Sequence, residues 1–351
     1  MNRIKSWIAK HEILSFFLLT FAISWGTWIP FVRLFYREGA YLAGVPISWG
    51  LFGPALAGIL ITRVLNPMRK GNRPKTPVLA FSLGLVVSAL VWISFTYFQV
   101  NLAWTTEIAL GVVLMGLLIA IPPAYVVSSA FGSNPRVREY LQSLIKLRGA
   151  WIYYLIALLV PPSLYWVGSL LSDALAQSAY WSPPPLIGWN AFRVLSLTFV
   201  YHFFFANTLG EEVGWRGFAL PRLQTRCSPL VASLILALVW FTWHLPIKMA
   251  NPDALPYYFY ALTFIPSSVF LTWIYNRTHG SILVVGLAHI ASNMGGELLF
   301  PITNAWLVLG FVVAIVQVLM DRMWVKKDQA NASVVPRAAE QRPAVVNSNS
   351  A

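Results

Sequence analysis

Long apolar stretches separated by short basic segments dominate the sequence. About 20 apolar residues are enough for a helix to cross the hydrocarbon core of a bilayer, and about ten stretches approach this length. Because they are continuously apolar rather than alternating, they favour helices over the strands of a membrane β-barrel. We therefore predict an all-α polytopic integral membrane protein of about ten transmembrane helices. The predicted spans are Ile13–Pro30, Trp49–Leu65, Val78–Phe98, Ile108–Ala130, Trp151–Leu171, Leu197–Leu220, Pro229–Ile247, Tyr257–Tyr275, Ser281–Phe300 and Ile302–Met320.

The distribution of charge agrees with this class of protein. Only 11% of the residues are charged, whereas a soluble domain carries about 25%. The net charge of +13 is spread between the apolar spans, so we assign it to membrane orientation and predict no nucleic-acid partner. Most basic clusters fall on one side of the bilayer if both termini are cytoplasmic, as the positive-inside rule expects. We expect the protein in a bacterial plasma membrane in that orientation.

The sixth predicted span contains three charged residues, Glu211, Glu212 and Arg216. A charged side chain at the centre of a bilayer costs roughly 2.5–3.5 kcal/mol on insertion scales. Glu212 and Arg216 are four residues apart on one helix face, so they can form an ion pair. Glu211 lies about 100° round the helix from Glu212 and has no obvious partner on the same helix. The spacing therefore predicts a structural pair and a separate functional carboxylate.

Two later spans bring further polar side chains to the interior. His244 lies in the seventh span, with Trp240 one turn before it, and the indole could wall or orient the imidazole. His289 and Asn293 share a face of the ninth span. Glu211 and the two histidines lie roughly 14–24 Å from the cytoplasmic ends of their helices at 1.5 Å per residue. We expect them to meet in a polar chamber that contains water.

This combination of side chains suits the hydrolysis of a peptide bond. Glu211 could act as the general base toward water, and Asn293 could donate to a developing oxyanion. A second possibility is that Glu211, His244 and His289 hold a divalent metal such as Zn²⁺ with an open position for water. No HExxH motif is present, and the single cysteine, Cys227, excludes an intrachain disulfide and a cysteine-rich metal site. The residues alone leave both chemistries open.

Three short motifs resemble a known family. "EEVGWR" begins at Glu211, "WFTWH" ends at His244, and "HIASN" runs from His289 to Asn293. They are similar to the EExxxR, FxxxH and HxxxN signatures of the CPBP intramembrane proteases, which include type II CAAX prenyl endopeptidases and bacteriocin-processing or self-immunity proteins. Trp240 stands where that family usually has phenylalanine. Each motif alone is weakly specific, whereas three in order within apolar spans are considerably more so.

The resemblance implies an intramembrane endopeptidase that cuts a membrane-associated protein or peptide, with prenylated CAAX-type proteins among the candidate substrates. It implies that Glu211 activates water, that His244 and His289 assist, and that Asn293 stabilises the oxyanion. The other two charged residues of the first motif would hold the site together. The family resemblance leaves the choice between a glutamic and a metal-dependent mechanism open.

The resemblance also divides the chain into segments. Residues 185–300 are predicted to be the protease-like core, and residues 1–184 are transmembrane helices without a recognised motif. Residues 301–328 contain the last transmembrane helix, and residues 329–351 form a polar tail that we predict to be disordered. His202, more than two helical turns before Glu211, is interpreted as a packing residue or a helix contact.

Two other functions fit part of the pattern. Glutamate, histidine and arginine within spans also mark proton-coupled transporters, but such proteins are expected to show inverted repeats, and the polar groups here lie only in the C-terminal half. A catalytically silent family member that acts in immunity or as a scaffold would retain the same fold. The lipid bilayer is the expected environment in every case.

Overall fold

The computed structural model describes residues 3–67, 76–99, 104–180, 182–183, 186–251 and 255–326. Every element in these ranges is a helix. The predicted tail, residues 329–351, lies outside the described residues.

The prediction of an all-α polytopic membrane protein is confirmed, although fewer helices than ten are long and apolar enough to span a membrane. Six such helices are found in the described chain, or up to eight if two bent pairs each count as one span. The six are α6 (Thr76–Gln99), α7 and α8 (Thr106–Ile119 and Ile121–Ala130), α10 (Ile152–Ala174), α15 (Tyr257–Arg277), α16 with η5 (Ile282–Met294 and Gly295–Leu299) and α17 (Asn304–Asp321). The bent pairs are α1 with α2 (Arg3–Lys10 and Glu12–Trp28) and Tyr41–Gly50 with α5 (Gly53–Leu65).

The lower number of membrane-spanning helices is explained mainly by the sixth and seventh predicted spans, which are interrupted. The span predicted at Leu197–Leu220 is not one α-helix, because α11 (Gly188–Phe205) ends at Ala206, whose φ of −136° and ψ of −92° are not helical. Two π-helical segments and a short helix follow: η3 (Asn207–Glu212), η4 (Trp215–Ala219) and α12 (Leu220–Gln224). In the seventh span α13 (Pro229–Trp243) gives way at His244 to α14 (Leu245–Ala250). The helices that carry the predicted site are therefore the interrupted ones.

Serine caps begin the two helices that carry the predicted site histidines. The Ser228 hydroxyl accepts a hydrogen bond from the backbone N–H of Val231 at the start of α13, and Ser281 does the same for Val284 at the start of α16. Such a cap satisfies one of the N–H groups that the first turn leaves unpaired. Pro229 at the first position of α13 adds a preset helical φ angle. These local signals determine where each helix begins. They therefore help to set the depth in the bundle of His244, which directly follows α13, and of His289, which lies in α16.

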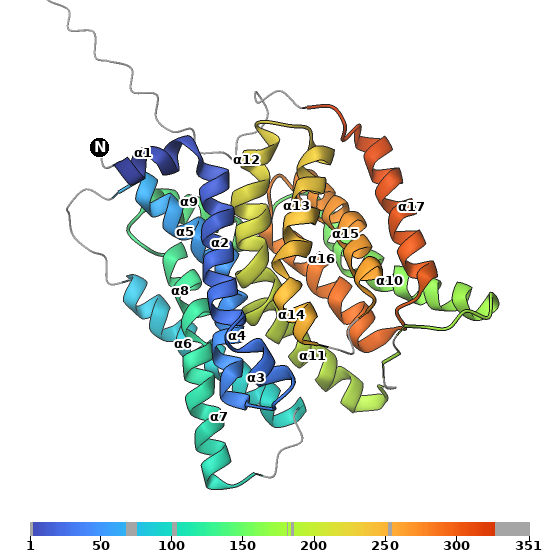
Figure 1. The fold of residues 1–351 in the computed structure, drawn as a ribbon, viewed down its shortest axis with the longest axis horizontal. Helices are drawn as coiled ribbons and strands as arrows, with labels where there is room; N and C mark the ends of the chain where they lie inside the picture. The colour runs from blue at the N-terminus through green and yellow to red at the C-terminus, as the bar shows by residue number, and fades with distance from the viewer. Residues whose placement is uncertain are drawn as a thin grey trace, which may run out of the picture.

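The C-terminal helices form the part of the molecule around the predicted site. Figure 1 shows α13, α15 and α16 as neighbours, with α10 and α17 on their outer side and α6, α7 and α8 at the other end of the molecule. The short η3 segment packs against α5, α11 and α16. Gly214, two residues after η3, lets the chain approach α5 closely, because a Cβ atom there would lie 2.3 Å from the backbone carbonyl carbon of Pro54. The segment that carries the adjacent glutamates is thus held at the centre of the bundle.

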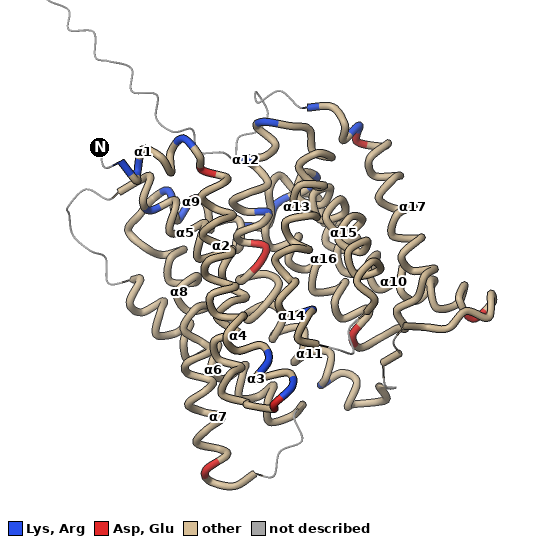
Figure 2. The backbone as a smooth tube through the Cα atoms, in the orientation of Figure 1, with Lys and Arg blue, Asp and Glu red and all other residues tan. Residues whose placement is uncertain are grey.

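Basic side chains are concentrated at one end of the bundle. Figure 2 shows most Lys and Arg residues near α1, α9 (Pro135–Leu141) and α12, and fewer near α3 (Val32–Tyr36) and α14 at the opposite end. This arrangement is the one that alternating basic loops predict for a membrane protein with a preferred orientation.

Candidate active site

The π-helical segment η3 places Asn207, Glu211 and Glu212 inside the protein. All three side chains are buried, with exposed fractions of 1%, 3% and 0%. Single π-helical turns inside longer helices are rare and occur often at functional sites. Here the altered turn directs polar side chains toward α13 and α16, where the second and third sequence motifs lie.

The predicted ion pair is present and completely buried. Arg216 Nη1 donates to Glu212 Oε1 over 2.9 Å, and neither side chain is exposed. Glu212 Oε1 also accepts a hydrogen bond from His289 Nδ1 over 2.8 Å, a contact that the spacing did not predict. Both contacts meet at the same carboxylate oxygen. This pair ties η3 and η4 to α16.

Glu211 faces a different direction and has a different partner. Its Oε2 atom accepts a hydrogen bond of 2.6 Å from Trp240 Nε1 of α13. Its Oε1 atom makes no hydrogen bond within the described part of the chain. Glu211 and Glu212 therefore have different partners, and the partner of Glu211 comes from another helix, α13.

Trp240 contacts four of the six residues that the sequence assigns to the site. Its indole donates to Glu211, and its carbonyl oxygen lies 2.9 Å from His244 Nδ1. The guanidinium of Arg216 lies 4.7 Å from the centre of its ring, and the ring of His289 meets it edge to face at 5.0 Å. A phenylalanine at this position would keep an aromatic ring but lose the N–H. The tryptophan therefore supplies a hydrogen-bond donor to Glu211 that the usual phenylalanine of the motif could not.

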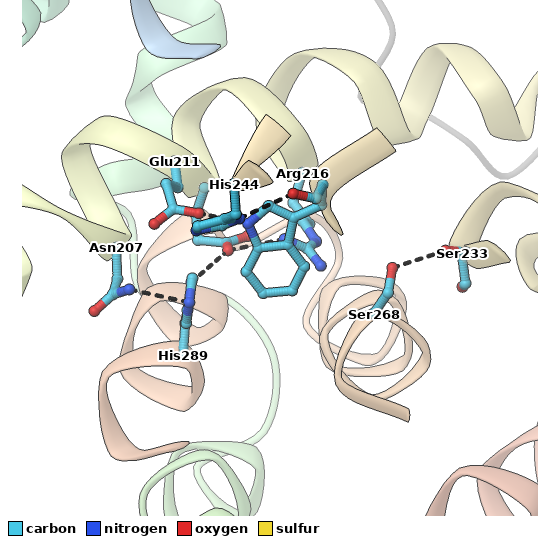
Figure 3. Close-up of polar contacts among 9 residues, drawn as sticks. Asn207, Glu211, Arg216, Ser233, His244, Ser268 and His289 are labelled. Atoms are coloured by element: carbon cyan, nitrogen blue, oxygen red, sulfur yellow. Dashed lines mark hydrogen bonds and ion pairs between the residues drawn. The ribbon is translucent and has the colours of Figure 1, made fainter. Parts of the chain in front are cut away.

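A cavity of about 320 Å³ collects the candidate catalytic side chains. Glu211, His244, His289 and Asn293 all line it, whereas Glu212 and Arg216 do not. Figure 3 shows Glu211, His244 and His289 close together, with Ser233 and Ser268 apart from them. The structure thus brings together the residues that the sequence drew from three separate spans.

The remaining lining of the cavity is largely apolar and aromatic. It comes from α10, α15, α16, η5 and α17 and includes Val160, Leu164, Phe264, Phe270, Leu307 and Val313. Two tyrosines, Tyr165 and Tyr260, and one further carboxylate, Glu297, also line the cavity. A small set of polar groups in a mostly apolar pocket is typical of sites that bind and orient a ligand.

Sequence reasoning missed three residues of this polar cluster. Asn207 lies 3.0 Å from His289 Nε2 through its Nδ2 atom and 2.8 Å from His202 Nδ1 through its Oδ1 atom. His202 Nε2 in turn lies 3.2 Å from Glu297 Oε2. His202 is therefore a helix contact, as interpreted, but a polar one. The available signal was that Asn207 and His202 are themselves polar residues in an apolar span.

The residues predicted to hold a metal do not form a metal site as the structure places them. Both ring nitrogens of His289 are engaged, one with Glu212 and one with Asn207, so the ring has no free lone pair to offer. One oxygen of Glu211 is bonded to Trp240. No group of three or more His, Cys, Asp or Glu side chains in the described ranges is arranged to hold a metal ion. The donor set does not fit a three-ligand zinc site.

Comparison with known proteins supports the predicted family resemblance. Residues 192–295 match the family described as type II CAAX prenyl endopeptidase Rce1-like. The chain is also 24% identical over 233 residues to CAAX prenyl protease 2 of Methanococcus maripaludis, an alignment that covers 64% of this chain and 84% of that protein. The chain resembles the CPBP intramembrane proteases, and both matches indicate a protease.

The buried ion pair generates a prediction about stability. Replacing Arg216 with Met leaves Glu212 charged and underpaired, so we expect a loss of about 3–5 kcal/mol in the free energy of unfolding. The double replacement Glu212→Leu and Arg216→Met removes both charges and should recover part of that loss. Equilibrium unfolding in detergent micelles measures both.

The matched control is Arg33→Met, which breaks the exposed pair that Arg33 forms with Glu38 over 3.4 Å. We expect this control to change the free energy of unfolding little, because surface pairs contribute about 0–1 kcal/mol. A double variant less stable than Arg216→Met would contradict the account.

Proposed function

We propose that the chain is an intramembrane endopeptidase in which Glu211 activates the water that attacks a peptide bond. The observation that supports this most is the convergence of Glu211, His244, His289 and Asn293 on one largely apolar cavity. A buried carboxylate with one oxygen fixed and the other without a partner among the described residues is suited to accept a proton from water.

The proposed roles follow from which atoms are free. Trp240 donates to one oxygen of Glu211, and Glu211 lines the cavity, where its other oxygen can accept from a water molecule. His244 Nδ1 donates to the backbone carbonyl oxygen of Trp240, so in a neutral ring Nε2 is an acceptor and can bind the attacking water. The half-buried amide of Asn293 makes no hydrogen bond to the described residues and can donate to the oxyanion. His289 assists by donating a hydrogen bond to Glu212 and by lining the cavity.

A proton balance completes the proposed step. Glu211 takes one proton from water as the hydroxide oxygen bonds to the carbonyl carbon. The carbonyl oxygen becomes an oxyanion, which the amide of Asn293 stabilises. When the carbon–nitrogen bond breaks, the proton held by Glu211 passes to the leaving amine. Glu211 returns to its ionised form, so the proposed step balances.

The proposed substrate is a membrane-associated protein or peptide. The apolar lining of the cavity suits a segment that enters from the bilayer, and the name of the Methanococcus protein makes a prenylated CAAX-type substrate one candidate. We also propose residues 185–300 as the protease core, and a bacterial plasma membrane with both termini cytoplasmic. Labelling of introduced cysteines from either face of sealed vesicles tests the orientation.

Replacing the proposed base should slow turnover strongly while leaving the fold intact. We expect Glu211→Gln to lower the rate of peptide cleavage by about 100-fold or more, because a general base contributes about 10²–10⁴-fold. Cleavage of a peptide panel by purified protein in liposomes measures this. The control is Glu107→Gln, which changes an exposed glutamate at the start of α7.

The outcomes separate the rival functions. Cleavage that is unchanged in Glu211→Gln would overturn the proposed mechanism. If the wild-type chain moves protons or a solute across the liposome and cleaves no peptide, transport is the better account. If it does neither, the silent-scaffold hypothesis gains support.

The engaged ligand atoms generate a separate prediction about metal dependence. Because His289 has no free ring nitrogen, we expect a chelator to leave the rate of cleavage unchanged. Elemental analysis of the active protein should find no bound divalent metal at a stoichiometric level. Loss of activity with a chelator, restored by one added metal, would contradict the proposed glutamic mechanism.

A further inference from the structure

A continuous chain of polar contacts joins the buried ion pair to the edge of the cavity. It runs from Glu212 to His289, then to Asn207, His202 and Glu297, over distances of 2.8, 3.0, 2.8 and 3.2 Å. Three of these residues belong to no motif. Figure 3 shows one link of the chain, between Asn207 and His289.

The donors and acceptors along this chain can be assigned from one end. An ionised Glu212 only accepts, so His289 Nδ1 carries a proton. In a neutral ring His289 Nε2 then accepts from the Nδ2 atom of Asn207, and the Oδ1 atom of Asn207 accepts from His202 Nδ1. The last contact, between His202 Nε2 and Glu297 Oε2, holds one shared proton. Each contact from Glu212 to His202 thus has one donor and one acceptor.

We propose that Asn207, His202 and Glu297 form a positioning relay that fixes the ring of His289 against Glu212 and ties it to a carboxylate at the cavity edge. The proposal rests on the proposed protease function and adds positioning residues to it. Only the cavity end of the relay, Glu297, is substantially exposed, with 53% of its side chain accessible.

Four separate elements build the relay. His202 is in the last turn of α11, Asn207 opens η3, His289 is in α16 and Glu297 is in η5. Gly295 lets η5 approach α10 closely, because a Cβ atom there would lie 2.7 Å from the ring of Tyr165. The break at Ala206 likewise brings Asn207 out of the register of α11. The break at Ala206 and the π-helical segments η3 and η5 thus meet in this one set of contacts.

Simple packing does not account for the arrangement. His202 and Asn207 are buried, with exposed fractions of 9% and 1%, and apolar residues would fill the same space without the desolvation cost of polar groups. In addition, a half-exposed glutamate such as Glu297 could remain fully hydrated. Its side chain instead contacts His202, which connects it through Asn207 to His289. A group bound near Glu297 would therefore affect the orientation of His289.

Kinetics of four variants test the relay. We expect Glu297→Leu to lower kcat by up to about 100-fold, the scale of a small misplacement of catalytic groups, with KM unchanged. Glu297→Gln, whose amide still bonds His202 Nε2, should restore much of kcat. Asn207→Leu cuts the relay between the two histidines. If Glu297 acts through Asn207, then adding Glu297→Leu to Asn207→Leu should have no further effect.

Other kinetic outcomes overturn the proposal. Multiplied effects in the double variant, or a change mainly in KM, would show that Glu297 contacts the substrate directly. Equal losses in Glu297→Gln and Glu297→Leu would also contradict the relay. Glu107→Leu, a matched change of an exposed glutamate outside the cavity, should leave both constants unchanged. If Asn207→Leu does not accumulate, Asn207→Ser is smaller and also fails to bridge the two rings.

A spectroscopic measurement separates this proposal from the protease function. The chain has five histidines, and ¹⁵N-histidine NMR of the full protein reports on their ring nitrogens, with or without activity. We expect Asn207→Leu to shift the signals of both His202 and His289, and Glu297→Leu to shift His202 and, through Asn207, His289. A His289 signal unchanged in both variants would overturn the relay, whereas unchanged cleavage in Glu211→Gln bears only on the proposed function.

Discussion

The structure depends on how two adjacent carboxylates and a guanidinium are buried together inside a membrane protein. Each group would be costly to bury alone. Here Glu212 and Arg216 pair with each other, and Glu211 has a separate partner. Glu212 accepts from Arg216 and His289, and Glu211 accepts from the indole of Trp240. Because Trp240 also lies against Arg216 and His289, one side chain connects the structural pair to the carboxylate that faces the cavity.

The interrupted helices follow from the same requirement. Non-helical or irregular backbone at membrane depth is tolerated where it is buried in protein or lines a cavity. The break at Ala206, the π-helical turns and the end of α13 at His244 all lie around the polar cluster. The outer helices α6, α7 and α17 carry none of these interruptions and present apolar side chains such as Leu83, Leu110 and Val308 outward. The interruptions are thus concentrated around the polar cluster, although the regular helix α17 also lines the cavity.

Much of the fold and the membership of the cluster could be predicted from the sequence. Apolar length fixes the helical class, and the four-residue spacing of Glu212 and Arg216 predicts a contact that the structure shows at 2.9 Å. Spacing could not predict the partner of Glu211, because that contact depends on how α13 packs against η3. Nor could it reveal the path from Asn207 through His202 to Glu297, which requires the break at Ala206 and the close approach of η5 to α10.

The hydrogen bond from Trp240 to Glu211 is the most direct point at which to test the account. Trp240→Phe removes the indole N–H while keeping an aromatic ring. The control Trp273→Phe removes the N–H of another buried tryptophan, whose Nε1 atom has no partner in the described structure. The measurement is the single-turnover rate of peptide cleavage at saturating substrate. The account predicts a fall of about 10-fold or more for Trp240→Phe, the scale of a lost hydrogen bond to a charged group, and no change for Trp273→Phe. Equal rates in the two variants would contradict it.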